Sequence, residues 1–182
     1  QPKVVALSTS NSAPAGANVA EPTSLDVAVA FSGGVSGTYT LQSVLGVDKE
    51  SWGSKSTGGR VRKILGPVMS EFHYYVPTSD EHVTVWFFVR CYATGATEVE
   101  TVVENGWLNV AGPGQRDYMV SVKVGGNQVY GPTSLAHLHH TRWSRSDWLG
   151  SDPGVTPAHD GAYLRATKLV PNYGYSNPSS AA

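Results

Sequence analysis

The sequence has a single cysteine, few charged residues and no long apolar run. Cys91 has no second cysteine to pair with, which excludes an intramolecular disulfide and any CxxC metal or redox motif. Charged residues make up 15% of the 182 residues and the formal net charge is −1, so a basic surface for nucleic acid or anionic lipid is not expected. No apolar run approaches the roughly 18 residues that a membrane-spanning helix requires. We therefore predict no nucleic-acid partner and no membrane span.

Motifs for nucleotide binding and nucleophilic catalysis are also missing. The chain has no P-loop, no dinucleotide-binding fingerprint and no G-x-S-x-G motif. Asp147, Asp152 and Asp160 lie in one Gly- and Pro-rich region with His159, and such groups serve glycosidases or hydrolytic triads when they converge. The structural interpretation is that Asp152 fixes a turn, that Asp147 or Asp160 pairs with Arg142, or that Asp160 caps the short helix. We favour that interpretation and predict no enzyme and no cofactor.

What the sequence contains instead is a two-residue alternation of apolar and other residues. Segments such as "LDVAVAF", "HVTVWFFVRCY" and "DYMVSVKVGGNQVYG" recur at a spacing of about ten residues, with turn residues between them. The second segment is bulky on both faces, as in a central strand, with Cys91 in phase with its valines and Trp86 in the core. The third predicts a hairpin closed at residues 125–127. This pattern predicts an all-β fold, an antiparallel β-sandwich or barrel of about eight or nine strands.

The ends of the chain differ in composition from the middle. Residues 1–22 and 174–182 are rich in Ser, Ala, Asn, Gly and Pro, which indicates a flexible N-terminal arm and a flexible C-terminal tail. Residues 23–173 are predicted to form a single domain. Within it, Ala158–Thr167 follows Pro157 and contains helix formers, so one short helix is expected near the C-terminus.

The stretch "AHLHHTRWSRSDW" at 136–148 concentrates histidine, tryptophan and arginine. His137 and His139 would share one face of a strand, which is a metal-ligand geometry and resembles the opening of the first cupin motif. Where that motif continues with a glutamate, this sequence has Trp143, Ser144 and Arg145. We therefore predict no metal site and expect the two histidines to hydrogen-bond neighbouring loops.

Aromatic residues near turns are the other candidates for function. An exposed Trp or Tyr ring can stack on a sugar ring, and protein interfaces use Trp, Tyr and Arg as anchors. We expect the stretch at 136–148 to be a strand end that runs into an interaction loop. The candidate binding residues of this loop and its surroundings are Trp107, Arg142, Trp143, Asp147, Trp148, Asp152, His159 and Asp160.

Three segments carry a family resemblance: "ILGPVMSEFHYY", "VTVWFFVRCYATGATEVETVVENGWL" and "WLGSDPGVTPAHDGAYLRATKLVPNY". Over about Gly66–Tyr173 the chain resembles a β-rich segment of phage- and prophage-encoded tail or virion structural proteins. Its first half is similar, more loosely, to the RIFT-barrel domain of rhamnogalacturonan-lyase-like proteins, in a strand with Arg and Tyr before an acidic "VEN" strand. The resemblance implies a β-rich assembly or receptor-contact module and no catalytic residues.

Two functions from different classes follow from these observations. The first is a non-enzymatic structural or interaction module of a phage-type virion, associated with capsid or tail. It would be homo-oligomeric, would contact other virion subunits, and would contact host-surface glycans. The alternative is a carbohydrate-binding module of a polysaccharide-acting protein, for which aromatic rings should line up on one exposed face.

Overall fold

The computed structural model describes residues 16–49, 57–106, 111–150, 152 and 161–167. Nine strands lie in these ranges, together with a short 3₁₀ helix, η1 (Leu41–Ser43), and one α-helix, α1 (Gly161–Ala166). The strands are β1 (Val27–Gly33), β2 (Gly37–Thr40), β3 (Gly59–Ile64), β4 (Met69–Pro77), β5 (Val83–Tyr92), β6 (Thr97–Asn105), β7 (Arg116–Val124), β8 (Asn127–His137) and β9 (Thr141–Leu149).

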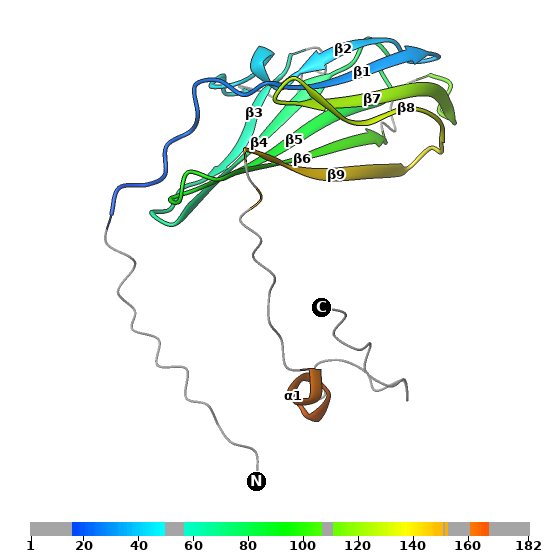
Figure 1. Cartoon of the computed structure of the whole chain (residues 1–182). Coiled ribbons are helices and arrows are strands. Elements are labelled where there is room, and N and C mark those ends of the chain that lie inside the picture. The colour runs from blue at the N-terminus through cyan, green and yellow to red at the C-terminus, as the bar shows by residue number, and fades with distance from the viewer. Residues whose placement is uncertain (1–15, 50–56, 107–110, 151, 153–160, 168–182) are drawn as a thin grey trace. The chain divides into compact units, whose positions relative to one another are not determined.

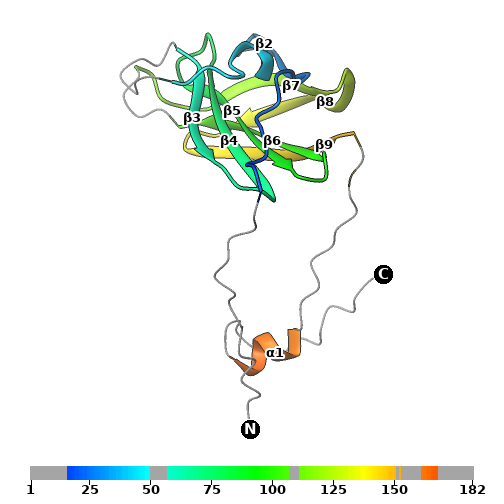
Figure 2. The same ribbon diagram turned by 90° about the vertical axis from the view of Figure 1, so that its left-hand side faces the viewer.

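The strands form two antiparallel sheets that pack face to face (Figure 1). The first sheet has the order β2-β1-β7-β8, and the second has the order β3-β4-β5-β6-β9. Figure 2 shows the same two layers after a quarter turn. The predicted all-β antiparallel sandwich is therefore confirmed, with nine strands in the described part of the chain. The long strands β8 and β9 each form one edge of their sheet, and β2 and β3 form the opposite edges.

The core lies between the sheets and follows the predicted alternation. Val27, Val29 and Phe31 of β1 face inward and are at most 6% exposed. On β5 the inward residues are Val83, Val85, Phe87, Val89 and Cys91, and each of them is buried. The position predicted for Cys91 is thus confirmed, and its thiol is free. Burying one such aliphatic or aromatic side chain contributes about 1.5–3 kcal/mol, so this two-sided apolar layer is the main source of stability.

The β7–β8 hairpin has the predicted turn. Gly125 and Gly126 connect the two strands with φ angles of 57° and 78°, a left-handed conformation that glycine adopts without steric cost. Tyr118, Val120 and Val122 of β7 point into the core, as the alternation predicts.

Part of the predicted N-terminal arm is bound to the domain. The amide of Val19 donates to the carbonyl of Gly66 at 2.8 Å, and the Ser70 hydroxyl donates to the carbonyl of Val19 at 2.7 Å. Arg60 and Tyr74 both donate to the carboxylate of Glu21. These hydrogen bonds attach residues 19–21, which belong to the predicted arm of residues 1–22, to the β-sandwich. Residues 1–15 lie outside the described ranges.

The C-terminal part of the chain is described only over residues 161–167. The chain divides into units of residues 1–152 and 153–182, and the predicted domain of residues 23–173 extends across this division. In the second unit, α1 lies within the helix predicted at Ala158–Thr167. The predicted tail at 174–182 lies outside the described residues. No helix in the described ranges is long and apolar enough to span a membrane.

Candidate functional site

The predicted interaction loop is mostly a strand. Thr141–Leu149 pairs with β6 along its whole length as the edge strand β9. Its side chains therefore alternate between the two faces of the sheet. Trp143 and Asp147 point inward opposite Val103 and Val99, while Arg142 and Trp148 point outward. The alternation of apolar and polar residues that marks a strand is missing at 141–149, because the charged residues Arg145 and Asp147 occupy inward positions.

The predicted binding residues that belong to the described ranges consequently do not gather in one place. Asp147 is bound on the inner face by the guanidinium of Arg145, at 2.7 to 3.0 Å, so the predicted pairing of Asp147 with Arg142 is wrong. Asp152 is exposed beyond the end of β9. Trp107, His159 and Asp160 lie outside the described residues, so the predicted pairing of Arg142 with Asp160 is untested. The ion pair of Arg145 with Asp147 points inward on the edge strand β9, and inward charges on an edge strand oppose its pairing with a strand of another chain.

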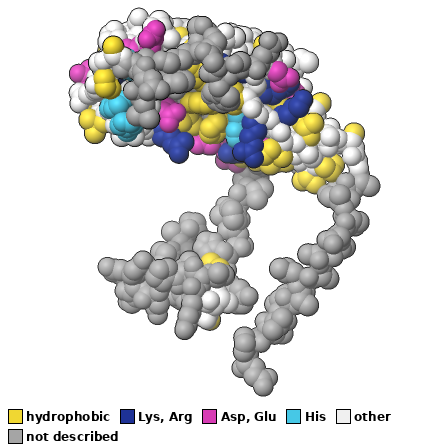
Figure 3. All heavy atoms as spheres, turned by 180° about the vertical axis from the view of Figure 1, so that it is seen from behind, with side chains coloured by type: hydrophobic (Ala, Val, Ile, Leu, Met, Phe, Trp, Pro, Cys, Tyr) yellow, Lys and Arg dark blue, Asp and Glu magenta, His cyan; other side chains and the backbone are white. Residues whose placement is uncertain are grey.

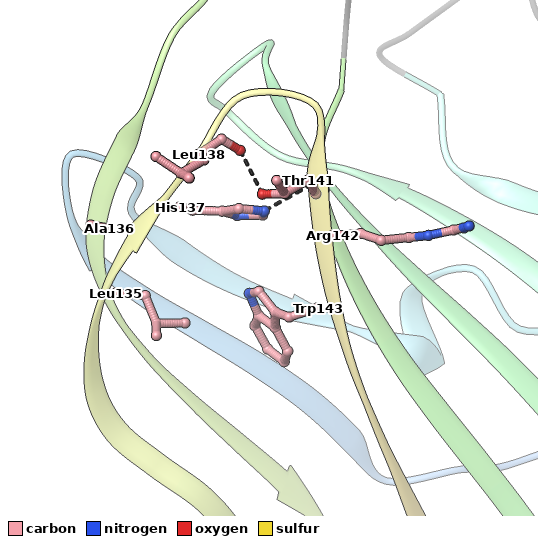
Figure 4. Close-up of a pocket in the computed structure, with 7 residues that line it drawn as sticks. All are labelled: Leu135, Ala136, His137, Leu138, Thr141, Arg142 and Trp143. Atoms are coloured by element: carbon pink, nitrogen blue, oxygen red, sulfur yellow. Dashed lines mark hydrogen bonds between the residues drawn. The ribbon is translucent and has the colours of Figure 1, made fainter. Parts of the chain in front are cut away.

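His137 belongs to a buried hydrogen-bond network that links both sheets (Figure 4). Nδ1 of His137 lies 2.7 Å from the Tyr118 hydroxyl, and Nε2 lies 2.9 Å from the carbonyl oxygen of Thr141. A carbonyl only accepts, so Nε2 carries the proton and Nδ1 accepts from Tyr118. The indole of Trp143 donates to the same phenolic oxygen at 3.0 Å. Burial lowers the pKa of His137 below its ordinary value of 6.5, which keeps the ring neutral.

This network removes His137 from the pair of potential metal ligands. Both of its ring nitrogens are bonded within the protein, and β8 ends at His137, so His139 lies in the following turn and not on the same strand face. Within the described part of the chain no group of three His, Cys, Asp or Glu side chains is placed to hold a metal ion. His137 therefore hydrogen-bonds Tyr118 of β7 and Thr141 at the start of β9, where the prediction was bonding of both histidines to neighbouring loops.

Asn105 fixes the turn that follows β8. Its side chain is fully buried and donates from Nδ2 to the carbonyl oxygens of Gly114 and His137, at 2.9 and 3.0 Å. Its backbone carbonyl accepts from the amide of His140, which has a φ of 61°. The β8–β9 turn is therefore held by β6 in one conformation.

A pocket of about 210 Å³ opens at this end of the sandwich. Figure 4 shows Leu135 and Trp143 beneath the turn, and shows that the side chain of Arg142 points away from this pocket. The polar groups of His137 and Thr141 are used in the network described above. This pocket thus has an apolar lining with few polar groups left for a ligand.

The outer face of the second sheet carries a second pocket and a cluster of charges. We call this second pocket, of about 190 Å³, the outer-face pocket. It is lined by His73, Trp86, Phe88, Val102, Glu104 and Arg142. These residues come from β4, β5, β6 and β9, and they stand on neighbouring positions of the register.

Trp86 is the aromatic platform of this pocket, and its predicted place in the core is wrong. Its neighbours Val85 and Phe87 are inward and fully buried, while Trp86 is half-buried on the opposite face. The ring of Tyr75 meets it edge-on at 5.1 Å. Phe88, two residues further along β5, is also half-buried.

Beside the pocket, one arginine is surrounded by three carboxylates. The Arg90 guanidinium donates to Glu71 at 3.2 Å and to Glu98 and Glu100 at 3.3 Å each. Glu71 also hydrogen-bonds His73, whose ring lies 4.4 Å from that of Phe88. Burial raises the pKa of the Glu71 carboxyl, but the hydrogen bonds and charges of His73 and Arg90 outweigh it and lower the pKa overall. This cluster is net negative, and it contacts the pocket lining through the hydrogen bond between Glu71 and His73.

The surface of the protein on the side opposite to the view of Figure 1 has both apolar and charged side chains. Figure 3 shows hydrophobic side chains next to basic, acidic and histidine side chains on the described part of the β-sandwich. Such a mixture suits a ligand with both apolar and polar faces better than it suits a purely electrostatic partner.

Sequence reasoning missed the outer-face pocket although one signal was present. The segment "TVWFFVRCY" is bulky on both faces, and the second face contains Trp86, Phe88 and Arg90. A central strand whose second face is both aromatic and charged indicates a surface that is not covered by a second core layer.

Comparison with known proteins identifies no relative. No protein-family model matches the sequence, and neither a curated protein nor a solved structure matches it.

Proposed function

We propose that this protein is a non-enzymatic carbohydrate-binding module whose ligand binds in the outer-face pocket. The observation that carries the proposal is the half-buried indole of Trp86 at the base of an open pocket with a charged rim. An aromatic ring provides a flat apolar surface for the C–H face of a pyranose, and nearby charged groups bind its hydroxyls. The volume of about 190 Å³ suits one or two sugar rings of a longer chain better than an enclosed small molecule.

Binding is favoured over hydrolysis because Glu104 is the one carboxylate among the described residues of the pocket lining, whereas a glycosidase uses a pair of carboxyl groups. A glycosidase requires a carboxylic acid whose pKa is raised so that it can donate a proton. The hydrogen bonds and charges around Glu71 lower its pKa overall, and Glu98 and Glu100 bind the Arg90 guanidinium. These three side chains therefore serve as acceptors that shape the sheet surface.

A glycan array tests this proposal with a matched pair of variants. Trp86→Ala removes the platform, and Trp148→Ala removes a tryptophan from the same sheet outside the pocket, where it packs against Tyr92. We expect the Trp86 variant to lose at least about tenfold in affinity, equivalent to about 1.4 kcal/mol, and the Trp148 variant to bind normally. Near-UV circular dichroism confirms that both variants are folded. The proposal fails if the wild-type protein binds no glycan, or if both variants bind as the wild type does.

A second candidate function is a structural one in a phage-type virion, where copies of the chain contact one another or other subunits. One observation favours it: Ile64, Leu65 and Val68, at the β3–β4 turn, are 45%, 49% and 59% exposed. Adjacent exposed apolar side chains of this kind mark a contact surface. Sedimentation of the wild type and of Val68→Asp tests this role. A chain that is monomeric at every concentration and does not bind any virion component would contradict it.

A further inference from the structure

The outer-face pocket has a carboxylate and a guanidinium on opposite strands that are not paired with each other. Glu104 of β6 and Arg142 of β9 are directly opposite in the register and both line the pocket. Neither side chain makes an ion pair or a hydrogen bond with another residue of the described ranges. A ligand that binds between the two groups therefore breaks no ion pair between them.

From this geometry we propose that the pocket binds an uncharged saccharide, with two neighbouring hydroxyls held between Glu104 and Arg142. This inference rests on the function proposed above and specifies its ligand. A sugar hydroxyl both donates and accepts, whereas a carboxylate only accepts and a guanidinium only donates. One hydroxyl of a vicinal pair donates to Glu104 and the other accepts from Arg142. Both hydrogen bonds are charge-assisted and therefore stronger than neutral ones.

The charges around the pocket disfavour ligands of either sign. A uronic acid would pair with Arg142, but its carboxylate would then lie close to Glu104, which is directly opposite Arg142 in the register. An amino sugar would pair with Glu104 and would be repelled by Arg142 at the rim. Like charges at short range oppose binding and give specificity against the wrong ligand. A neutral sugar alone uses both groups without repulsion.

The aromatic side of the pocket is held in place for stacking. Phe88 packs on the ring of His73 at 4.4 Å, and His73 is hydrogen-bonded to Glu71. Trp86 packs against Tyr75 at 5.1 Å. Because these rings are fixed before a ligand arrives, little side-chain entropy is lost on stacking.

The test compares glycan classes first and then variants. An array with neutral, uronic-acid and amino-sugar oligosaccharides identifies the class bound by the wild type. The strongest neutral ligand is then titrated by calorimetry into Glu104→Gln and Arg142→Gln. The controls are Glu81→Gln and Arg62→Gln, which change the same residue types at exposed positions outside the pocket.

We expect neutral oligosaccharides to bind best and each pocket variant to bind at least about tenfold more weakly, while the controls are unchanged. Affinity should change less than about twofold between low and high salt, because no net charge is paired. Binding of acidic or amino glycans alone would overturn the inference and leave carbohydrate binding intact. The inference would also be overturned, and carbohydrate binding left intact, if Glu104→Gln and Arg142→Gln both bind a neutral glycan normally while Trp86→Ala does not. Binding of no glycan at all would instead refute the proposed function, and this inference with it.

Discussion

The phenolic oxygen of Tyr118 lies 2.7 Å from Nδ1 of His137 and accepts the indole N–H of Trp143 at 3.0 Å. One hydroxyl thus connects the hairpin β7–β8 of the first sheet to the edge strand β9 of the second. The stretch that concentrates histidine and tryptophan in the sequence is therefore a structural link between the two layers. Changes to the residues of this link should therefore change the free energy of unfolding.

Acid should destabilise the fold through His137. Its pKa is lowered by burial in the folded protein, while in the unfolded chain it titrates near 6.5. The unfolded state therefore binds a proton first, and stability should fall as the pH drops below 6.5 and level off below the folded pKa. Each unit by which the pKa is lowered corresponds to about 1.4 kcal/mol. Urea unfolding between pH 7.5 and 5 measures this slope. His137→Gln should reduce it and His140→Gln should not, and equal slopes in all three proteins would disprove the assignment.

Removing the Tyr118 hydroxyl should destabilise the sandwich at neutral pH. Tyr118→Phe leaves Nδ1 of His137 and Nε1 of Trp143 without a partner, at about 1–3 kcal/mol for each buried group. Tyr130→Phe is the matched control, because Tyr130 packs on Trp143 at 5.9 Å and its hydroxyl bonds no other residue of the described ranges. It should change stability by less than about 0.5 kcal/mol. Equal unfolding midpoints for the two variants would contradict the network.

Arg90 should stabilise the protein in a pH-dependent way. Arg90→Met leaves three glutamates close together, and we expect a loss of about 1–3 kcal/mol at pH 7. The pKa of Glu71 is lowered in the folded state, so its contribution is present above its ordinary value of 4.5 and is lost as the pH falls through the folded value. The difference between wild type and variant should therefore shrink at pH 4. Arg62→Met, at an exposed position, serves as the control, and a pH-independent difference for Arg90→Met would refute this account.

Cys91 should be unreactive in the native protein. It is 4% exposed, and burial raises the pKa of its thiol above 9.0, so little thiolate is present at neutral pH. A disulfide reagent such as dithionitrobenzoate should label it fully in urea and only slowly in buffer. Rapid labelling of the folded protein would show that β5 opens readily or that the thiol is accessible.

The sandwich itself could be predicted because its inward positions are almost purely apolar. Alternation in β1, β5 and β7 separates Val and Phe from small or polar residues, and Gly125-Gly126 matches the turn that joins two twisted strands. These signals are local, so one sequence is sufficient to read them.

The binding surface could not be predicted in the same way, since it depends on the register between strands. Arg142 and Glu104 are 38 positions apart in the chain and become neighbours only through β6–β9 pairing. Trp86 was assigned to the core because a central strand with bulky residues on both faces does not reveal which face is covered. Arg145 and Asp147 are charged but point inward, so the sequence of β9 resembles that of a loop.

The most direct test of the central claim is a chemical-shift titration of the labelled protein with the glycans that an array selects. Stacking in the outer-face pocket predicts saturable shifts of the Trp86 indole and the His73 ring, while the amide signals of Gly125 and Gly126 in the β7–β8 turn stay in place. Shifts confined to the neighbourhood of His137, or no shift of Trp86 at saturating neutral oligosaccharide, would contradict the account.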